Sequence, residues 1–376
     1  MRRFVLAGLL LFGLAALVAL PAYGTSPGKN GQIVYMHANN LFVINADGSG
    51  ERELPHTAGL SDDQPDWSPD GSKVAFQRCR ERACNVWTVT RSGASLRRIG
   101  RAGDEADPAW APNGKQIAYS RGGGGDAYDF PLEPDQIEHA EIYVMNANGG
   151  AAHPLTGITT GKPFSADVEA PAWSPSGKQI VFAVHNSKLG EPANQRALFV
   201  INADGSAQRQ LTPWSLNGGG RLDWSPDGKL ILFRVAVARK AHGDLYTVNA
   251  DGSGLKQLTR YPAPKAVFSG SFSPDGKWIT FSRFSGSRPY PSLFTMRTDG
   301  TGILWCDGRR SHDLPPGARV TARRSPEPVR LARLHPAPFT DRLVRKFQLP
   351  VAGWRGPATS RSTGADGGTV SPEGAE

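Results

Sequence analysis

Short apolar runs alternate with tight polar turns through most of the chain, from about residue 33 to residue 305. Five of these runs closely resemble one another: Val74–Phe76, Ile117–Tyr119, Ile180–Phe182, Ile231–Phe233 and Ile279–Phe281. Short runs rich in β-branched and aromatic residues, bounded by turn residues, are typical of strands rather than helices. The pattern therefore predicts an all-β domain built from many short strands.

A turn motif precedes each of these runs. Its five copies begin with an aromatic residue and end with glycine: Trp67–Gly71, Trp110–Gly114, Trp173–Gly177, Trp224–Gly228 and Phe272–Gly276. The common form is Trp-Ser-Pro-Asp-Gly, in which proline presets φ for the turn and glycine accepts the left-handed φ that follows. A second turn, Ala-Asp-Gly-Ser, recurs later in the repeat, for example at Ala203–Ser206, and favours a hairpin. We interpret the aromatic residue as a packing group between adjacent sheets.

The motif recurs with a period that indicates a particular architecture. Successive aromatic residues are 43, 63, 51 and 48 residues apart, and several strands within such a period are the signature of a β-propeller. A sixth set of strands precedes the first motif, at Ile33–Tyr35, Leu41–Ile44 and Glu51–Leu54. We predict a six-bladed β-propeller with four-stranded antiparallel blades, whose first blade is incomplete because its innermost strand is missing.

These repeats resemble those of the TolB-like family of β-propellers. The resemblance covers about Gln32 to Leu304 and rests on the five motif copies. It implies a binding or scaffold role in the cell envelope, although propellers serve many functions. TolB itself has an α/β domain before its propeller, whereas repeat sequence begins in this chain at Ile33–Tyr35; no such domain is expected.

The N-terminus has the pattern of an export signal. Arg2 and Arg3 precede an uncharged run, Phe4–Leu20, and small residues follow at Ala22 and Gly24. This order is typical of a cleaved secretory signal, so residues 1–24 are predicted to be a signal peptide. An uncleaved single-span anchor is the alternative, because 17 residues lie at the short end of what crosses a bilayer. We expect a periplasmic or secreted protein without a stable membrane span after cleavage.

The repeat pattern stops at Trp305, and the composition changes there. Residues 306–376 contain 12 Lys and Arg against 7 Asp and Glu, with many prolines and glycines. We predict a domain at residues 25–305 and a tail at 306–376, which is either a disordered basic segment or the product of a displaced reading frame. The formal net charge of +9 comes mainly from this tail and from Arg2 and Arg3, which leaves +2 between them. A charge concentrated outside the folded domain argues against a nucleic-acid partner.

Three cysteines bear on the compartment. Cys79 and Cys84 flank a four-residue turn between two strand-like runs, so a disulfide across a hairpin is predicted in an oxidising space. Two reduced thiols are the alternative, and Cys306 is left over. No grouping of Cys and His has the spacing of a zinc site, and no metal or other cofactor is expected. A channel cation such as Ca²⁺ stays open.

Loop lengths indicate which face of the ring binds a partner. Strand order places both recurring turns on one face, which we call the turn face, and the longer connections on the other, which we call the loop face. Long connections occur at Arg121–Ala140, His185–Arg196 and Thr212–Gly220, and variable loops on a rigid scaffold commonly bind ligands.

Polar residues just before the aromatic positions are the candidate binding residues. They are Asp63, Asp107, Glu169 and Arg221. We expect them to gather around the central channel at the loop face, a region that we call the channel mouth, where they would attract a cation or a basic segment of a partner. The alternative is that they are solvated turn acids that cap backbone groups.

Catalysis has little support in the sequence. No Gly-x-Ser-x-Gly elbow occurs, and no α/β-hydrolase-sized domain follows the repeats. We therefore predict a monomeric, non-enzymatic binding or scaffold protein whose partner is an envelope or extracellular protein or peptide. The alternatives are a propeller lyase or hydrolase that uses carboxylates at the channel mouth, and an accessory propeller related to prolyl-oligopeptidase-type peptidases.

Overall fold

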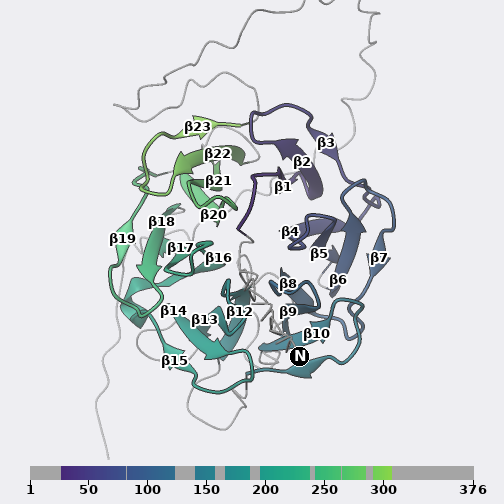
Figure 1. Cartoon of the computed structure of the whole chain (residues 1–376), viewed down its shortest axis with the longest axis horizontal. Helices are drawn as coiled ribbons and strands as arrows, with labels where there is room; N and C mark the ends of the chain where they lie inside the picture. Colours follow the sequence, from purple (N-terminus) through teal and green to yellow (C-terminus); the bar gives the residue numbers. More distant parts are fainter. Residues whose placement is uncertain are drawn as a thin grey trace, which may run out of the picture. The chain divides into compact units, whose positions relative to one another are not determined.

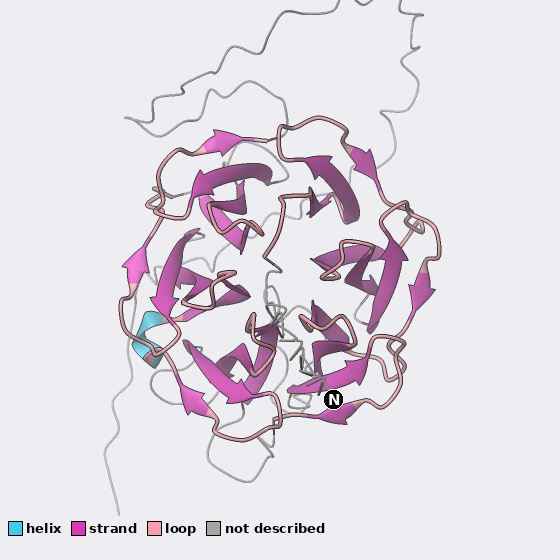
Figure 2. Cartoon of the chain, in the orientation of Figure 1, coloured by secondary structure: helices cyan, strands magenta, loops and turns pink. Residues whose placement is uncertain are grey.

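The computed structural model describes residues 27–81, 83–122, 140–156, 166–186, 195–237, 242–263, 265–284 and 291–306. These residues form six antiparallel sheets arranged as blades around a central channel (Figures 1 and 2). The predicted signal peptide, and the predicted tail apart from Cys306, lie outside the described residues. Within the described ranges, no helix is long and apolar enough to cross a bilayer.

Blades 1 to 3 come from the first half of the chain. Blade 1 contains β1 (Gln32–His37), β2 (Asn40–Asn45) and β3 (Arg52–Glu53). Blade 2 contains β4 (Ser61–Trp67), β5 (Lys73–Arg80), β6 (Ala83–Thr90) and β7 (Arg97–Arg98). Blade 3 contains β8 (Glu105–Trp110), β9 (Gln116–Arg121), β10 (Glu141–Asn146) and β11 (His153–Pro154).

Blades 4 to 6 repeat the same order from the channel outward. Blade 4 contains β12 (Ala166–Trp173), β13 (Gln179–Asn186), β14 (Gln195–Asn202) and β15 (Arg209–Gln210). Blade 5 contains β16 (Gly218–Trp224), β17 (Leu230–Val237), β18 (His242–Asn249) and β19 (Lys256–Gln257). Blade 6 contains β20 (Ala266–Phe272), β21 (Trp278–Phe284), β22 (Ser292–Arg297) and β23 (Leu304–Trp305), and a 3₁₀ helix (η1, Trp214–Leu216) precedes β16.

The six-bladed prediction is confirmed, including the incomplete first blade. Blades 2 to 6 have four strands each, whereas the described part of blade 1 has three, in the order β1-β2-β3. The Asn-Ala-Asp-Gly turn that follows β2 matches the turn that follows β14, so β1 corresponds to the second strand of the other blades. The innermost strand is therefore the one that blade 1 lacks among the described residues.

The recurring aromatic residue packs between blades, as predicted. Trp110, Trp173, Trp224 and Phe272 are each at most 6% exposed. Trp224 lies among apolar residues of blades 4 and 5, and its indole nitrogen donates a hydrogen bond to the carbonyl oxygen of Ala172 in blade 4 at 3.1 Å. Burial of so large a side chain at these seams stabilises the contact between neighbouring sheets.

The Ser-Pro-Asp-Gly turns are held by their own side chains. In blade 5, the Ser225 hydroxyl accepts a hydrogen bond from the backbone N–H of Leu230 at 2.9 Å and donates one to Asp227 at 2.7 Å. Gly228 has a φ of 71°, in the region where a side chain would be strained. The motif thus makes a locally stabilised turn from β16 into β17.

Blades 6 and 1 meet without sharing a strand in the described part of the chain. Ile44 of blade 1, Leu293 of blade 6 and Cys306 form a buried cluster, against which Ile33 and Tyr35 pack. Cys306 is 3% exposed, and its N–H donates to the carbonyl oxygen of Leu293 at 3.0 Å. Cys306 is therefore packed as part of the propeller, one position beyond the end of the repeat pattern, because it fills this seam.

Candidate functional site

The innermost strands carry a bulge at the same level around the channel. In blades 2, 3 and 4 the pairing register shifts next to a residue with positive φ: Gln64 (52°), Asp107 (51°) and Ala170 (54°). Each stands three residues before its aromatic residue. Asp107 therefore matches Gln64 in position, whereas Asp63 and Glu169 stand one residue earlier, and the four residues of the channel mouth occupy two levels rather than one.

Arg221 reaches across the channel. It stands three residues before Trp224 on β16, which lies opposite β4 in the ring (Figure 1). Its guanidinium group donates a hydrogen bond to the side-chain oxygen of Gln64 at 3.1 Å and another to the backbone carbonyl oxygen of Pro65. Because blades 2 and 5 are on opposite sides of a six-membered ring, these bonds span the channel and brace it.

Three aspartates of the inner strands link blade 2 to blade 3, blade 3 to blade 4 and blade 5 to blade 6. Asp66 accepts a hydrogen bond from the N–H of Trp110 at 2.7 Å, and Asp223 accepts one from the N–H of Phe272 at 2.7 Å. Asp107 accepts one from the N–H of Ala170 at 3.1 Å. In each case a carboxylate satisfies a backbone donor of the following blade that would otherwise lack a partner. The inner aspartates are therefore inter-blade links.

Burial changes the acidity of two of these carboxyl groups. Loss of hydration raises the pKa of Asp107 to about 6, and the negative charge of Glu169 acts in the same direction, whereas the hydrogen bond from Ala170 and the charge of Arg221 oppose it. Burial likewise raises the pKa of Asp66 to about 6, against the opposing effects of Arg221 and the Trp110 N–H. Arg221 is thus the cation that these two partly buried acids share.

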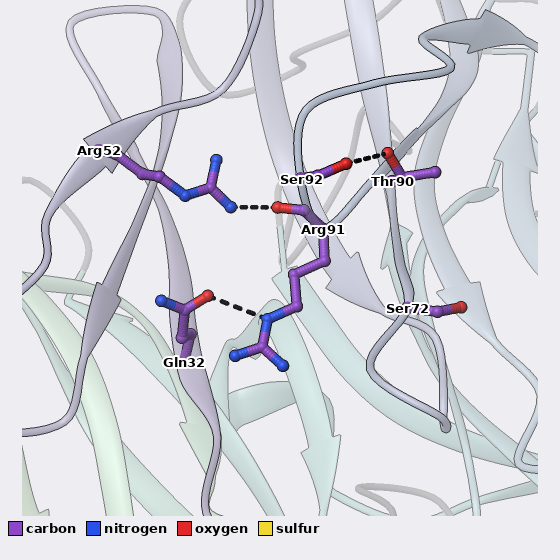
Figure 3. A pocket seen from close by; sticks show the side chains of 6 residues that line it. All are labelled: Gln32, Arg52, Ser72, Thr90, Arg91 and Ser92. Atoms are coloured by element: carbon purple, nitrogen blue, oxygen red, sulfur yellow. Dashed lines mark hydrogen bonds between the residues drawn. The ribbon is translucent and has the colours of Figure 1, made fainter.

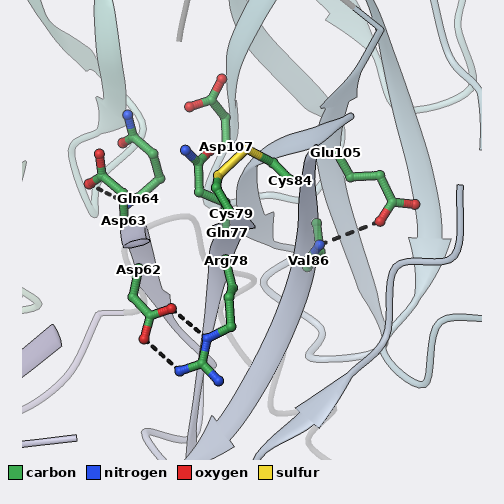
Figure 4. Close-up of a disulfide and its surroundings, with 10 residues drawn as sticks. All are labelled: Asp62, Asp63, Gln64, Gln77, Arg78, Cys79, Cys84, Val86, Glu105 and Asp107. Carbon is green, nitrogen blue, oxygen red and sulfur yellow. Dashed lines mark hydrogen bonds and ion pairs between the residues drawn. A yellow bond between two sulfur atoms is a disulfide. The ribbon is translucent and has the colours of Figure 1, made fainter. Parts of the chain in front are cut away.

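Asp63 and Glu169, which stand one residue earlier than Asp107 relative to the aromatic residue, also have partners. Glu169 forms an ion pair with Arg196 at 2.8 Å, and both side chains are about one-seventh exposed. Asp63 accepts a hydrogen bond from the N–H of Gln64 at 2.6 Å, and Figure 4 shows it beside Gln64 on the same strand. Within the described residues, no three His, Cys, Asp or Glu side chains are arranged to hold a metal ion.

Sequence reasoning missed one exposed aromatic residue on an innermost strand. Phe268 stands four residues before Phe272 on the innermost strand β20, as Asp63 stands before Trp67 and Glu169 before Trp173. Its side chain is 44% exposed, with the guanidinium group of Arg234 5.7 Å from the ring centroid. Counting back from each aromatic residue would have found Phe268, Asp66 and Asp223. The innermost strands therefore carry an exposed aromatic side chain in blade 6 as well as the acids of blades 2 to 4.

The hairpin between β5 and β6 borders this region. The structure joins Cys79 and Cys84, which lie directly opposite each other in the strand register, by a disulfide (Figure 4). Nearby, Arg78 forms a buried two-bonded ion pair with Asp62, with Nη2–Oδ2 at 2.6 Å, and packs against the rings of Phe76 and Trp87. These contacts tie β4 to β5. Of the long connections on the loop face, residues 123–139 and 187–194 lie outside the described residues, while Thr212–Gly220 contains η1.

Solved structures with the same fold include two TolB proteins. A putative TolB from Agrobacterium tumefaciens aligns with a TM-score of 0.53 at 19% identity, over 73% of this chain and 89% of that one. TolB from Acinetobacter baumannii aligns with a TM-score of 0.56 at 20% identity, over 73% and 63%. The tricorn protease gives a TM-score of 0.53 at 15% identity, over 78% of this chain and 27% of its own. At identities this low, the structural alignments establish a shared fold and nothing more specific. No family model matches the chain.

Curated relatives match a much shorter stretch of the chain. An NAD kinase from Leifsonia xyli subsp. xyli is 82% identical over 55 residues, which is 15% of this chain and 18% of that enzyme. NAD kinase 2 of Streptomyces coelicolor is 74% identical over 54 residues, or 14% and 18%. The chain thus spans about a fifth of the length of these relatives.

Proposed function

We propose that this protein is an exported, non-enzymatic β-propeller of the TolB-like type that binds an envelope or extracellular protein or peptide. Support for export comes from the charged and apolar N-terminal sequence and from the Cys79–Cys84 disulfide, a bond typical of oxidising compartments. Support for binding comes from the fold shared with TolB proteins and from the surface at the channel mouth.

The observation that carries the proposal is the exposure of Phe268 on the innermost strand of blade 6, in the same ring as the acids of the channel mouth. A large aromatic side chain left 44% exposed on an innermost strand offers a contact for a partner, and Asp63 and Glu169 lie on innermost strands of other blades. A partner segment with an apolar and a basic residue would meet both kinds of surface. The Arg221–Gln64 bond across the channel limits how deep such a segment enters.

Affinity capture from the envelope fraction, read out by mass spectrometry, tests this proposal. We expect Phe268→Ser to lose the partner that the wild-type propeller retains. Leu255→Ser is the matched control, because Leu255 is similarly exposed, at 47%, but lies next to β19 at the outer rim. Equal retention by the two variants would contradict a binding role for the channel mouth.

The two raised pKa values favour a second candidate, a lyase or hydrolase that uses channel carboxylates. Acid–base catalysts often have such values, and Asp66 and Asp107 have pKa values of about 6. Their hydrogen bonds to neighbouring blades already give both residues a structural role. Polysaccharide and peptide turnover that disappears in Asp107→Asn, with the fold intact, would favour the enzyme.

The NAD kinase matches do not support NAD kinase activity for the whole chain, because they span less than a fifth of those enzymes. Outside the six blades, only the residues after Cys306 form a stretch long enough to contain a match of 54 or 55 residues. We infer that the match lies there. This placement would make the segment after the propeller a sequence related to part of NAD kinases.

A further inference from the structure

A hollow on the turn face lies at the seam between blades 1 and 2. Its volume is about 570 Å³, and six residues line it: Gln32, Arg52, Ser72, Thr90, Arg91 and Ser92 (Figure 3). Two guanidinium groups, three hydroxyl groups and one amide form this lining, and none of the six is acidic. The hollow therefore carries two positive charges beside several hydrogen-bond donors.

The two arginines are held in place by the seam itself. The side chain of Arg52 donates a hydrogen bond to the backbone carbonyl oxygen of Arg91, and Nε of Arg91 donates one to the side-chain oxygen of Gln32 at 3.2 Å. Gln32 is oriented in turn by Asn45, at 3.2 Å. In the described part of the chain, neither arginine forms an ion pair, and the two terminal nitrogens of Arg91 form no hydrogen bond. The side chain of Arg91 is thus held in one orientation, while its two terminal nitrogens are available to donate paired hydrogen bonds to an anion.

Other seams of the ring show what is different at this one. Between blades 4 and 5, Arg209 donates to the carbonyl oxygen of Ala250 at 2.7 Å, and the neighbouring turn residue is Asp251. Between blades 5 and 6, Lys256 donates to the carbonyl oxygen of Asp299 at 3.2 Å. In both seams a turn carboxylate lies close enough to the basic residue for that residue to lower its pKa.

Blade 2 replaces these turn residues with others. Arg91 stands where blade 5 has Ala250, and Ser92 stands where blade 5 has Asp251. The seam between blades 1 and 2 has therefore lost the carboxylate that accompanies the basic residue at those two seams and has gained a second guanidinium group. Like charges repel each other, so two guanidinium groups that line one hollow favour the binding of an anion there, although the Asp70 carboxylate lies one hydrogen bond beyond Ser72.

We propose that the hollow between blades 1 and 2 is a binding site for a small oxyanion, which takes the place of the missing turn carboxylate. The terminal nitrogens of Arg91 offer the paired donors that suit phosphate, sulfate or carboxylate oxygens. The hydroxyl groups of Ser72 and Ser92 line the same hollow but already form hydrogen bonds with Asp70 and Thr90, so the donors for the anion are those of Arg91. This site lies on the turn face and does not depend on the function proposed for the channel mouth.

Isothermal titration of the full chain with sodium phosphate, sodium sulfate and sodium acetate, at constant ionic strength, tests the site. We expect one anion bound per chain, with Arg91→Ala weakening the affinity at least tenfold. A preference for phosphate or sulfate would identify a tetrahedral anion as the ligand, and a preference for acetate a carboxylate; either result supports the site. Absence of binding by any of the three would overturn it.

Ser92→Asp provides the sharper variant, because it restores the residue type that this turn has in blade 5 and is therefore compatible with the fold. The built-in carboxylate should abolish anion binding and raise the melting temperature in anion-free buffer. Arg209→Ala, which changes the corresponding arginine at another seam, should leave anion binding unchanged. Anion affinity that survives Ser92→Asp, or that falls equally in Arg209→Ala, would contradict the assignment.

Discussion

The aspartates of the inner strands and the aspartates of the turns belong to the same repeat, but their surroundings differ. Asp107 lies against the next blade, and loss of hydration raises its pKa to about 6. Asp204 lies on an exposed turn, where hydrogen bonds from the side chain and backbone of Ser206 lower its pKa. Asp47 and Asp251 have the same turn environment and the same direction of shift. One residue type therefore serves as an inter-blade link near the channel and as a local turn cap at the rim.

The two groups of aspartates differ in which part of the ring stabilises their charge. Turn acids are stabilised as anions chiefly by neighbours two residues away, and only to a smaller extent by a basic residue of the adjoining blade, so most of their stabilisation is local. Inner acids are stabilised by donors from another blade and by one arginine from the far side of the channel. Changes near the channel should therefore affect the whole ring, whereas changes in a turn should stay local.

Arg221→Ala should lower the free energy of unfolding more than any other substitution proposed for these aspartates and their partners. Removing the guanidinium group leaves Asp66 and Asp107 without their shared cation and removes both hydrogen bonds across the channel. We expect the free energy of unfolding at pH 7, measured in urea, to fall by about 2 kcal/mol, less than the roughly 3 to 5 kcal/mol for breaking a fully buried charge pair, because Arg221 and the two acids are only partly buried.

Arg209→Ala is the matched control for this substitution. Arg209 is exposed at the rim and donates to a single backbone carbonyl oxygen, that of Ala250. Its loss should lower the free energy of unfolding by less than about 1 kcal/mol. Similar losses for the two arginine variants would mean that Arg221 is not a brace.

Asp107→Asn should produce a smaller effect that depends on pH. A carboxyl group whose pKa is higher in the folded protein than in the unfolded chain binds a proton more readily when folded. Its contribution to stability is complete below about pH 4 and is lost as the pH rises through about 6. Asparagine has no such loss and keeps an oxygen for the N–H of Ala170. The stability of Asp107→Asn relative to wild type should therefore increase between pH 5 and pH 7, by about 1 kcal/mol. Melting temperatures of both proteins at the two pH values measure this change.

Asp204→Asn should not share this behaviour. The pKa of Asp204 is lowered, so its contribution is present above the unfolded value of about 4 and is lost only as the pH falls further. Between pH 5 and pH 7 its difference from wild type should stay constant. A matching pH dependence in both variants would remove the distinction between inner and turn aspartates.

The sequence predicts the fold well because the repeat is local chemistry. A Ser-Pro-Asp-Gly turn and the strand after it are encoded within about ten residues, and five copies give the blade count. The missing innermost strand of blade 1 was also predictable, since no motif precedes Ile33.

The candidate site was less predictable because it depends on contacts between distant blades. The one-residue offset between Asp63 and Asp107 comes from bulges whose position the strand pattern does not reveal. The bond from Arg221 to Gln64 joins residues 157 positions apart. The alternative of solvated turn acids describes Asp107 only in part: it does cap a backbone group, but that group belongs to the next blade, and the side chain is not fully solvated.

Site-resolved NMR titration of the aspartate carboxyl carbons tests the central distinction most directly. We predict that the carboxyl group of Asp107 titrates with a pKa of about 6 and that Asp204 titrates below its ordinary value of 3.8 in the same sample. This result would identify Asp107 as a buried link between blades. Titration of Asp107 near 3.8, together with Asp204, would mean that the acid at the channel is solvated, and it would contradict the role of Asp107 as a buried inter-blade link.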